Sequence, residues 1–179
     1  MCDTLRKAAE AYQGLCRRRY RFTFSNDKQI EVVFKPQNFV HLAGLRKLND
    51  INEFQDHHSA VNIFKMILQG KINDYDLQQS VHYDTDAEER IFFLIELENL
   101  LNTQFAVWDF NPQKGSRINT RLKSKVIFFR NESRDFYLML GLAPDGQTYY
   151  PETFFLRFDD AYIRGQDIVK IVSVEICSI

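Results

Sequence analysis

The chain has 179 residues, of which 45% are hydrophobic and 26% are charged, and its formal net charge is −1. These values are ordinary for a globular protein that is long enough to bury a core of its own. They argue against a strongly basic nucleic-acid-binding protein, and because no apolar run reaches about 18 residues, we expect no membrane span and no membrane partner.

The N-terminal segment lacks the uninterrupted apolar stretch of a signal peptide. The three cysteines, Cys2, Cys16 and Cys177, are odd in number and far apart, so they predict reduced thiols rather than a disulfide framework or a zinc site. We therefore expect a cytoplasmic protein. Since no repeat or long linker is visible, we expect a single domain over residues 1–179, with an N-terminal helix at 1–19 and the main domain at 20–176.

The first quarter of the chain predicts a helix, a hairpin and a second helix. Residues 3–19 are rich in helix-forming residues and place apolar residues near helical spacing. Residues 20–35 contain two alternating runs around the turn sequence SNDK, which predicts a β-hairpin. Pro36 ends the second strand and opens a helix, because proline is tolerated in the first helical turn, and Gly44 is expected to end that helix.

Three further helices are predicted in the middle of the chain. The sequence HSAVNIFKMILQG places Val61 and Phe64 on one apolar side and ends at Gly70, a good helix terminator. A short helix follows behind an Asn73 cap. The sequence DTDAEERIFFLIELENLLN has acids at its N-terminal end and a thick apolar stripe, which predicts one long helix.

The second half of the chain predicts strands. Five alternating or apolar runs have this character, and the third and fourth are joined by the turn sequence APDGQ. The runs are residues 104–110, 125–130, 135–142, 148–158 and 168–176. Helices followed by antiparallel strands predict an α+β fold, in which N-terminal helices pack on one face of a C-terminal antiparallel β-sheet.

Charge is unevenly distributed along the chain. Residues 114–134 contain seven Lys or Arg residues against Glu132 alone, whereas residues 84–98 contain six acids against Arg90. Such asymmetry can build a positive face that receives a phosphate backbone. The alternative is two solvated surfaces of opposite sign.

The motifs of metal- or nucleotide-dependent phosphate chemistry are not visible: there is no Gly-rich phosphate loop, CxxC or HExxH sequence, so we expect no cofactor. Cleavage of RNA without a metal needs a base, a group that stabilises the phosphorane, and an acid. His41 is the first candidate for proton transfer. On a continuous helix His41 would share the apolar face of Leu45 and Leu48, so the alternative is a core histidine bonded to backbone.

Cations near the apolar elements are further candidates. Arg46 and Lys47 follow His41 and can grip phosphate, Arg as a fork and Lys as a point charge, although solvated side chains are the alternative. Arg90 lies in line with the apolar stripe of the predicted long helix and therefore needs a fixed partner. Asp86, four residues earlier, is the structural partner that the spacing offers.

Hydroxyl and amide side chains complete the set of candidates. Ser80 and His82 would lie on one face if their segment were a strand. Thr153 interrupts an aromatic run at a strand position, where it would present a hydroxyl. Gln166 follows in the sequence YIRGQ, after a predicted loop.

Taken together, the segments NFVHLAGLRKL, LQQSVHY, ERIFFLIELENLL, YPETFFLRF and YIRGQ occur in an order that resembles a known family. This is the phage-associated, fourth group of the barnase–EndoU–colicin–RelE-like nuclease domains, and the resemblance extends from about residue 20 to residue 176. It implies helices followed by a four-stranded antiparallel sheet, and a metal-independent, toxin-like endoribonuclease of phage or mobile-element origin.

The resemblance also implies site residues. His41, Lys47, Ser80, Arg90 and Thr153 fall in the family-like segments and are the candidate catalytic residues. His41 would be the general base or acid, Lys47 and Arg90 would hold the scissile phosphate, and Ser80 or Thr153 would donate hydrogen bonds.

The predicted partner is RNA, with tRNA as one candidate, and a neutralising protein is a further candidate partner. The candidate substrate-binding residues are Arg46, Arg121, Lys123, Lys125 and Gln166. Two alternatives stay open at this point. One is a non-catalytic RNA- or protein-binding module of the same fold, which would tolerate loss of the histidine, and the other is a structural phage accessory protein.

Overall fold

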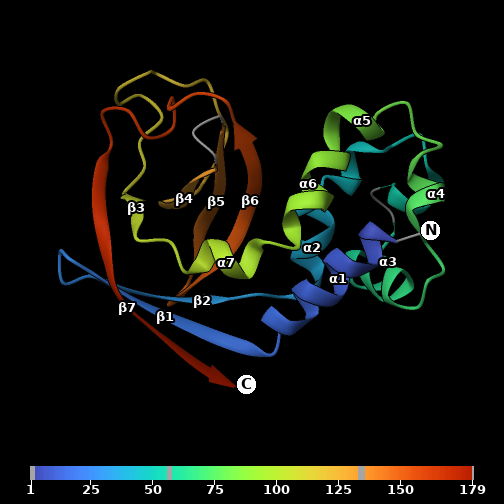
Figure 1. Ribbon diagram of the computed structural model, residues 1–179, viewed down its shortest axis with the longest axis horizontal. Coiled ribbons are helices and arrows are strands. Elements are labelled where there is room, and N and C mark those ends of the chain that lie inside the picture. Colours follow the sequence, from blue (N-terminus) through green and yellow to red (C-terminus); the bar gives the residue numbers. More distant parts are fainter. Residues whose placement is uncertain (1–2, 56–57, 133–135, 179) are drawn as a thin grey trace. The chain divides into compact units, whose positions relative to one another are not determined.

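The computed structural model describes residues 3–55, 58–132 and 136–178, apart from the side chain of Asp86 (Figure 1). The chain divides into two compact units. The helical unit comprises residues 1–17 and 35–98, and the strand unit comprises residues 18–34 and 99–179. That the two fold together as one domain stays a prediction. No helix in the described residues is long and apolar enough to span a membrane.

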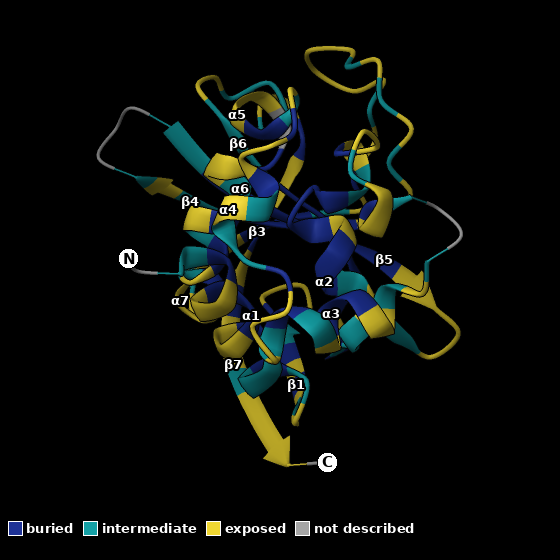
Figure 2. Cartoon of the chain, turned by 90° about the vertical axis from the view of Figure 1, so that its right-hand side faces the viewer, coloured by how far each residue is buried: buried dark blue, intermediate teal, exposed yellow. Residues whose placement is uncertain are grey.

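The first helix, α1 (Thr4–Leu15), forms as the sequence predicts. The Asp3 side chain accepts the backbone N–H of Arg6 at 3.1 Å, which caps the N-terminal end of the helix. Buried residues recur along α1 at helical spacing, with exposed residues between them (Figure 2). The buried residues are Leu5, Ala8, Ala9, Tyr12 and Leu15.

The second helix, α2 (Pro36–Leu42), begins with proline in its first turn, as predicted. It ends before Gly44, whose φ of 75° is the left-handed conformation that glycine adopts without strain. Two short 3₁₀ turns follow, η1 (Leu45–Lys47) and η2 (Asn52–Phe54). The predicted end of the helix at the glycine is confirmed.

Helix α3 (Ala60–Leu68) and helix α4 (Asp74–Leu77) are also confirmed. Asn73 caps α4 by accepting the N–H of Tyr75 at 2.9 Å. The prediction for Val61 is wrong, because this side chain is 45% exposed while Ile63 is buried instead.

The prediction of one long helix after residue 83 is wrong. The segment forms three short helices, α5 (Tyr83–Asp86), α6 (Glu88–Leu94) and α7 (Leu97–Leu101). Between α6 and α7 the N–H of Glu96 donates to the carbonyl oxygen of Phe93 at 2.9 Å, three residues back rather than four, so α-helical bonding is interrupted there. Leu100 and Leu101 at the end of α7 are both buried, 0% and 1% exposed.

The strand unit contains, among its described residues, seven strands that close into a barrel in the order β1-β2-β6-β5-β4-β3-β7. All the predicted strands are confirmed. The strands are β1 (Arg18–Phe24), β2 (Gln29–Val33), β3 (Phe105–Trp108), β4 (Val126–Glu132), β5 (Phe136–Asp145), β6 (Thr148–Arg157) and β7 (Asp167–Ser178).

The sheet differs from the one expected. The N-terminal hairpin joins the C-terminal strands, with β1 antiparallel to β7 and β2 parallel to β6 through the pair Val32 and Tyr149. The expected four-stranded, purely antiparallel sheet is therefore wrong, because the sheet is larger and mixed. The α+β class is confirmed, but most helices and all the strands described above lie in different compact units, with α7 crossing the boundary at residues 98–99.

The strand unit has its own core. Val107, Phe110, Ile127 and Met139 are at most 3% exposed, and Tyr162 is among the partly buried residues that pack against them. The C-terminal half of β7 is exposed, as Figure 2 shows near the end of the chain. The helical unit buries residues such as Phe39, Leu42 and Leu45, each 0% exposed, and this packing fixes the turn that follows α2.

Candidate functional site

His41 lies in the last turn of α2, and its side chain is exposed. The expectation that it shares an apolar face with Leu45 and Leu48 is wrong. These two leucines are 0% exposed, because the left-handed Gly44 redirects the chain between them and His41. The carbonyl of His41 accepts the N–H of Gly44 at 3.0 Å, which closes the helix. The imidazole therefore lies where a substrate can reach it.

Lys47, at the end of η1, is exposed, whereas the neighbouring Arg46 is half-buried and holds a loop. The Arg46 guanidinium donates to the carbonyl oxygens of Phe54 at 3.1 Å, of Gln55, and of His58 at 2.6 Å. These bonds occupy much of the guanidinium fork that would otherwise grip phosphate. Arg46 thus holds the loop that carries Phe54, Gln55 and His58. It also lines a cavity of about 380 Å³ together with Phe54 and Gln55.

Ser80 is 7% exposed, and its hydroxyl donates to the Asp50 carboxylate at 2.6 Å. The same hydroxyl oxygen accepts the N–H of His82 at 3.1 Å, and the N–H of Val81 donates to Asp50 at 2.9 Å. The segment is a turn and not a strand, so the proposed common face of Ser80 and His82 does not form. The hydrogen bond from Ser80 is the main cause that lowers the pKa of Asp50.

Asp50 carries no signal in the sequence that marks it as part of the site. Thirty residues separate it from Ser80, and no local pattern connects the two. The proton of the Ser80 hydroxyl is committed to Asp50, which points to a positioning role for the serine.

Arg90 lies in α6 and is partly exposed. Its predicted partner is Asp86, whose side chain lies outside the described residues. Together with His41, Lys47 and Ser80, Arg90 belongs to the helical unit. Four of the five candidate catalytic residues are therefore in one unit.

Thr153 is the fifth candidate and belongs to β6 of the strand unit. It is 7% exposed and lies opposite Gly141 of β5. A Cβ on Gly141 would lie 2.8 Å from the Thr153 methyl group and 2.4 Å from the Ser124 hydroxyl oxygen. The glycine therefore leaves the space that these two hydroxyl residues occupy. Glu152 accepts the Ser124 hydroxyl at 2.6 Å.

Gln166 joins two loops of the strand unit. Its amide nitrogen donates to the carbonyl oxygens of Asn111 at 2.8 Å and Lys114 at 3.1 Å, and its amide oxygen accepts the N–H of Asn111 at 3.2 Å. Gln166 is 9% exposed. Beside it, a Cβ on Gly115 would lie 1.9 Å from the carbonyl oxygen of Arg164. The predicted substrate-binding glutamine is thus placed to hold the basic segment.

The basic segment, residues 111–125, is a long irregular stretch between β3 and β4. Lys114 pairs with Asp167 at 2.7 Å and Lys125 pairs with Asp109 at 3.3 Å. Three exposed cations have no acidic partner among the described residues. They are Arg117, Arg121 and Lys123. Arg134 is the last of the seven cations between residues 114 and 134, and it lies outside the described residues.

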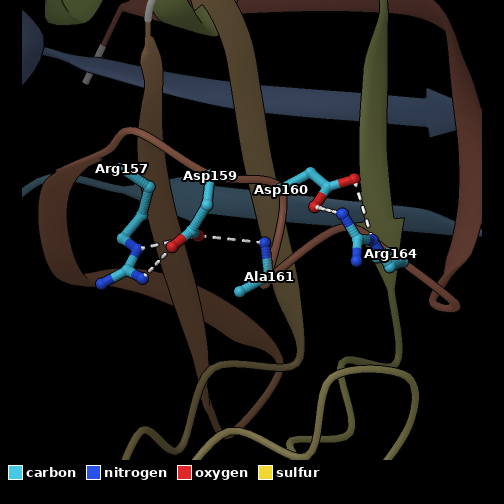
Figure 3. A network of polar contacts seen from close by, with 5 residues as sticks. All are labelled: Arg157, Asp159, Asp160, Ala161 and Arg164. Carbon is cyan, nitrogen blue, oxygen red and sulfur yellow. Dashed lines mark hydrogen bonds and ion pairs between the residues drawn. The ribbon is translucent and has the colours of Figure 1, made fainter.

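The connection between β6 and β7 carries a network of ion pairs (Figure 3). Arg157 pairs with Asp159 at 2.5 Å, and Arg164 pairs with Asp160 at 2.7 Å. Asp159 also accepts the N–H of Ala161 at 3.1 Å (Figure 3). The hydrogen bond from Arg157 is the main cause that lowers the pKa of Asp159. These arginines are neutralised by neighbouring acids, unlike the three exposed cations of the basic segment.

Within the described ranges, no group of three or more His, Cys, Asp or Glu residues is placed to hold a metal ion. A family model described as phage-Barnase-EndoU-ColicinE5/D-RelE like nuclease 4 matches residues 4–175. The chain belongs to this family. The match confirms the resemblance and identifies a nuclease type of phage origin. Neither a curated protein nor a solved structure matches the chain.

Proposed function

We propose that the chain is a metal-independent endoribonuclease of phage or mobile-element origin. The observation that carries the proposal is the family match over residues 4–175, because it includes both compact units. Exposed acid–base and cationic side chains in the family-like segments support it. RNA is the substrate that suits such groups, since its 2′-hydroxyl is an internal nucleophile, and tRNA is a candidate target.

His41 is the proposed proton-transfer residue. A neutral imidazole removes the proton of the 2′-hydroxyl, the 2′-oxygen forms a bond to phosphorus, and the bond from phosphorus to the 5′-oxygen breaks. The leaving 5′-oxygen takes a proton from water and the His41 imidazolium releases its proton to solvent, so the products are a 2′,3′-cyclic phosphate and a 5′-hydroxyl. His41 suits this role because its ring is exposed at the end of α2.

Cations would stabilise the negative charge that gathers on the phosphorane. Lys47 is exposed and follows His41 by only six residues, on the other side of the Gly44 turn. Arg90 is the second proposed phosphate ligand. We assign Ser80 a positioning role, because its hydroxyl donates to Asp50, and we keep Thr153 as a candidate hydrogen-bond donor.

The basic segment is the proposed binding surface for the RNA backbone. Arg117, Arg121 and Lys123 are exposed and have no acidic partner in the part of the chain that the structure describes. Gln166 holds the beginning of this segment in place. A neutralising protein partner would bind where it covers these cations or His41.

The test is incubation of RNA with the purified protein in excess EDTA, followed by identification of the new RNA ends. We expect discrete cleavage that leaves cyclic phosphates. His41→Ala should lower the rate by roughly 10² to 10⁴, the usual contribution of one acid–base group. Lys47→Ala should also slow cleavage, whereas Lys65→Ala, which removes an exposed lysine on α3, should not. Cleavage that stops in EDTA, or that survives His41→Ala, would reject the proposal.

A second candidate function is RNA binding without turnover, which the three exposed cations of the basic segment favour. In that case RNA affinity should fall steeply as salt rises, and replacement of each contacting cation by alanine should reduce the salt slope by about 0.7 for single-stranded RNA. Intact RNA in the cleavage assay together with salt-dependent binding would select this function.

A further inference from the structure

The helical unit contains an acidic cavity of about 410 Å³ that the proposed nuclease site does not use. The residues that line it include the acids Asp3, Asp74 and Glu88 and the tyrosines Tyr75 and Tyr83. None of the described residues that line it is Lys, Arg or His. The volume lies within the range of sites that bind small organic ligands.

Helix caps fix the acidic wall of this cavity. Asp74 accepts the N–H groups of Thr4 at 2.7 Å and Leu5 at 2.9 Å, and Asp3 caps the same helix, α1. These two carboxylates are therefore held in place by folded backbone. Glu88, at the start of α6, is exposed and has no ion pair with a described residue. Among the described residues that line the cavity, three carry a negative charge and none carries a positive charge.

Tyr83 is the second and independent feature of the cavity. It is 8% exposed, it lines the cavity, and its hydroxyl makes no hydrogen bond to any residue that the structure describes. Burial, followed by the charges of Asp74, Glu88 and Asp84, raises the pKa of Tyr83 to about 12. The hydroxyl therefore stays protonated, and its oxygen is available to accept a hydrogen bond from a ligand in the cavity.

Tyr75 supplies an aromatic surface at the edge of the same cavity. It is 70% exposed, so its ring face is open to a ligand. Cations are attracted to the face of an aromatic ring, and the attraction adds to that of nearby carboxylates. Negative charge, a hydroxyl oxygen and an open ring together match an organic cation rather than an anion or an apolar group.

We propose that this cavity binds a ligand that carries a primary ammonium or guanidinium group. Glu88 and Asp74 supply the charge, the Tyr83 hydroxyl oxygen accepts a hydrogen bond, and Tyr75 covers the cation. Such a group is carried by a free polyamine or by a Lys or Arg side chain of a partner protein. The site goes beyond the proposed nuclease activity and does not depend on it.

The test is calorimetric titration of the full chain with two probes at low salt: spermidine, and a capped Gly-Arg-Gly peptide. We expect saturable binding of at least one probe at one site. Glu88→Gln should weaken it roughly three- to tenfold, and Tyr83→Phe, which removes only the hydroxyl, about fivefold. Glu89→Gln is the matched control, because it removes the neighbouring exposed acid of α6 that does not line the cavity.

The two probes distinguish the two possible sources of the cationic group. Binding of spermidine alone assigns the site to free polyamines, and binding of the peptide alone assigns it to protein side chains. The proposal is overturned if neither probe binds at about 10 mM, or if Glu89→Gln weakens binding as much as Glu88→Gln does. Thermal unfolding checks that each variant is folded. If Tyr83→Phe does not fold, the comparison of the two exposed glutamates decides, because neither is buried.

Discussion

Two loops approach closely in the strand unit, which predicts that two glycine substitutions there lower the free energy of unfolding by very different amounts. Gly115 and Gly146 both have left-handed φ angles, 68° and 61°. A Cβ on Gly115 would lie 1.9 Å from the carbonyl oxygen of Arg164 and 2.9 Å from its carbonyl carbon, whereas a Cβ on Gly146 meets nothing within 4 Å. Alanine at the two positions therefore has the same conformational cost, but only Gly115→Ala forces backbone apart.

The loss of stability in each variant is the sum of a conformational cost and a steric cost. A left-handed conformation costs an alanine about 1–2 kcal/mol at either position. Separating the loops at Gly115 adds about 1–3 kcal/mol, as overpacking usually does, and strains the hydrogen bonds from Gln166 to Asn111 and Lys114. We therefore expect Gly115→Ala to lower the free energy of unfolding by about 1–3 kcal/mol more than Gly146→Ala does.

The assay is urea unfolding followed by tryptophan fluorescence. Trp108 is the only tryptophan in the chain and lies in β3 of the same unit, so it reports on the strand unit directly. The difference should appear as a lower midpoint for Gly115→Ala at an unchanged slope. Equal midpoints for the two alanine variants would refute the close contact between the loops.

Three further predictions concern the helical unit and the cysteines. Gly14→Ala should raise the free energy of unfolding by about 0.5–1 kcal/mol, measured by thermal unfolding, because Gly14 lies inside α1 and a Cβ there meets nothing within 4 Å. The bond from Ser80 lowers the pKa of Asp50, so its stabilisation is complete above the ordinary carboxyl pKa of about 4 and is lost as pH falls through the lowered value. Asp50→Asn should therefore narrow the difference between the urea midpoints at pH 7 and pH 3. Burial raises the pKa of Cys16 to about 12, so iodoacetamide at pH 8 should label the exposed Cys177 long before Cys16, as mass spectrometry of the peptides will show.

Local signals in the sequence predicted most elements of the fold. Alternating apolar residues gave the strands, and caps such as Asn73 gave helix ends, because these effects act between residues close in the chain. The pairing of strands could not be obtained in this way. β2 meets β6 through Val32 and Tyr149, which are far apart in sequence, and no local property of either strand selects that partner.

The candidate site was predictable only in part. The sequence identified Gly44 as a helix end, yet the consequence, that His41 is exposed while Leu45 is buried, depends on how the chain continues after the turn. The bond between Asp50 and Ser80 joins residues 30 positions apart, so spacing could not reveal it. The types of the candidate residues indicate which chemistry they could perform. The role of each one depends on contacts between segments that are distant in the chain.

The most direct test of the central claim is rescue of the His41→Ala protein by imidazole. RNA cleavage would be measured in excess EDTA, under single-turnover conditions, with and without added imidazole. If His41 transfers the proton, the variant is slow and imidazole restores cleavage at the same positions. Wild-type rates in the variant without imidazole, or a loss that imidazole leaves unchanged in a folded protein, would contradict the account.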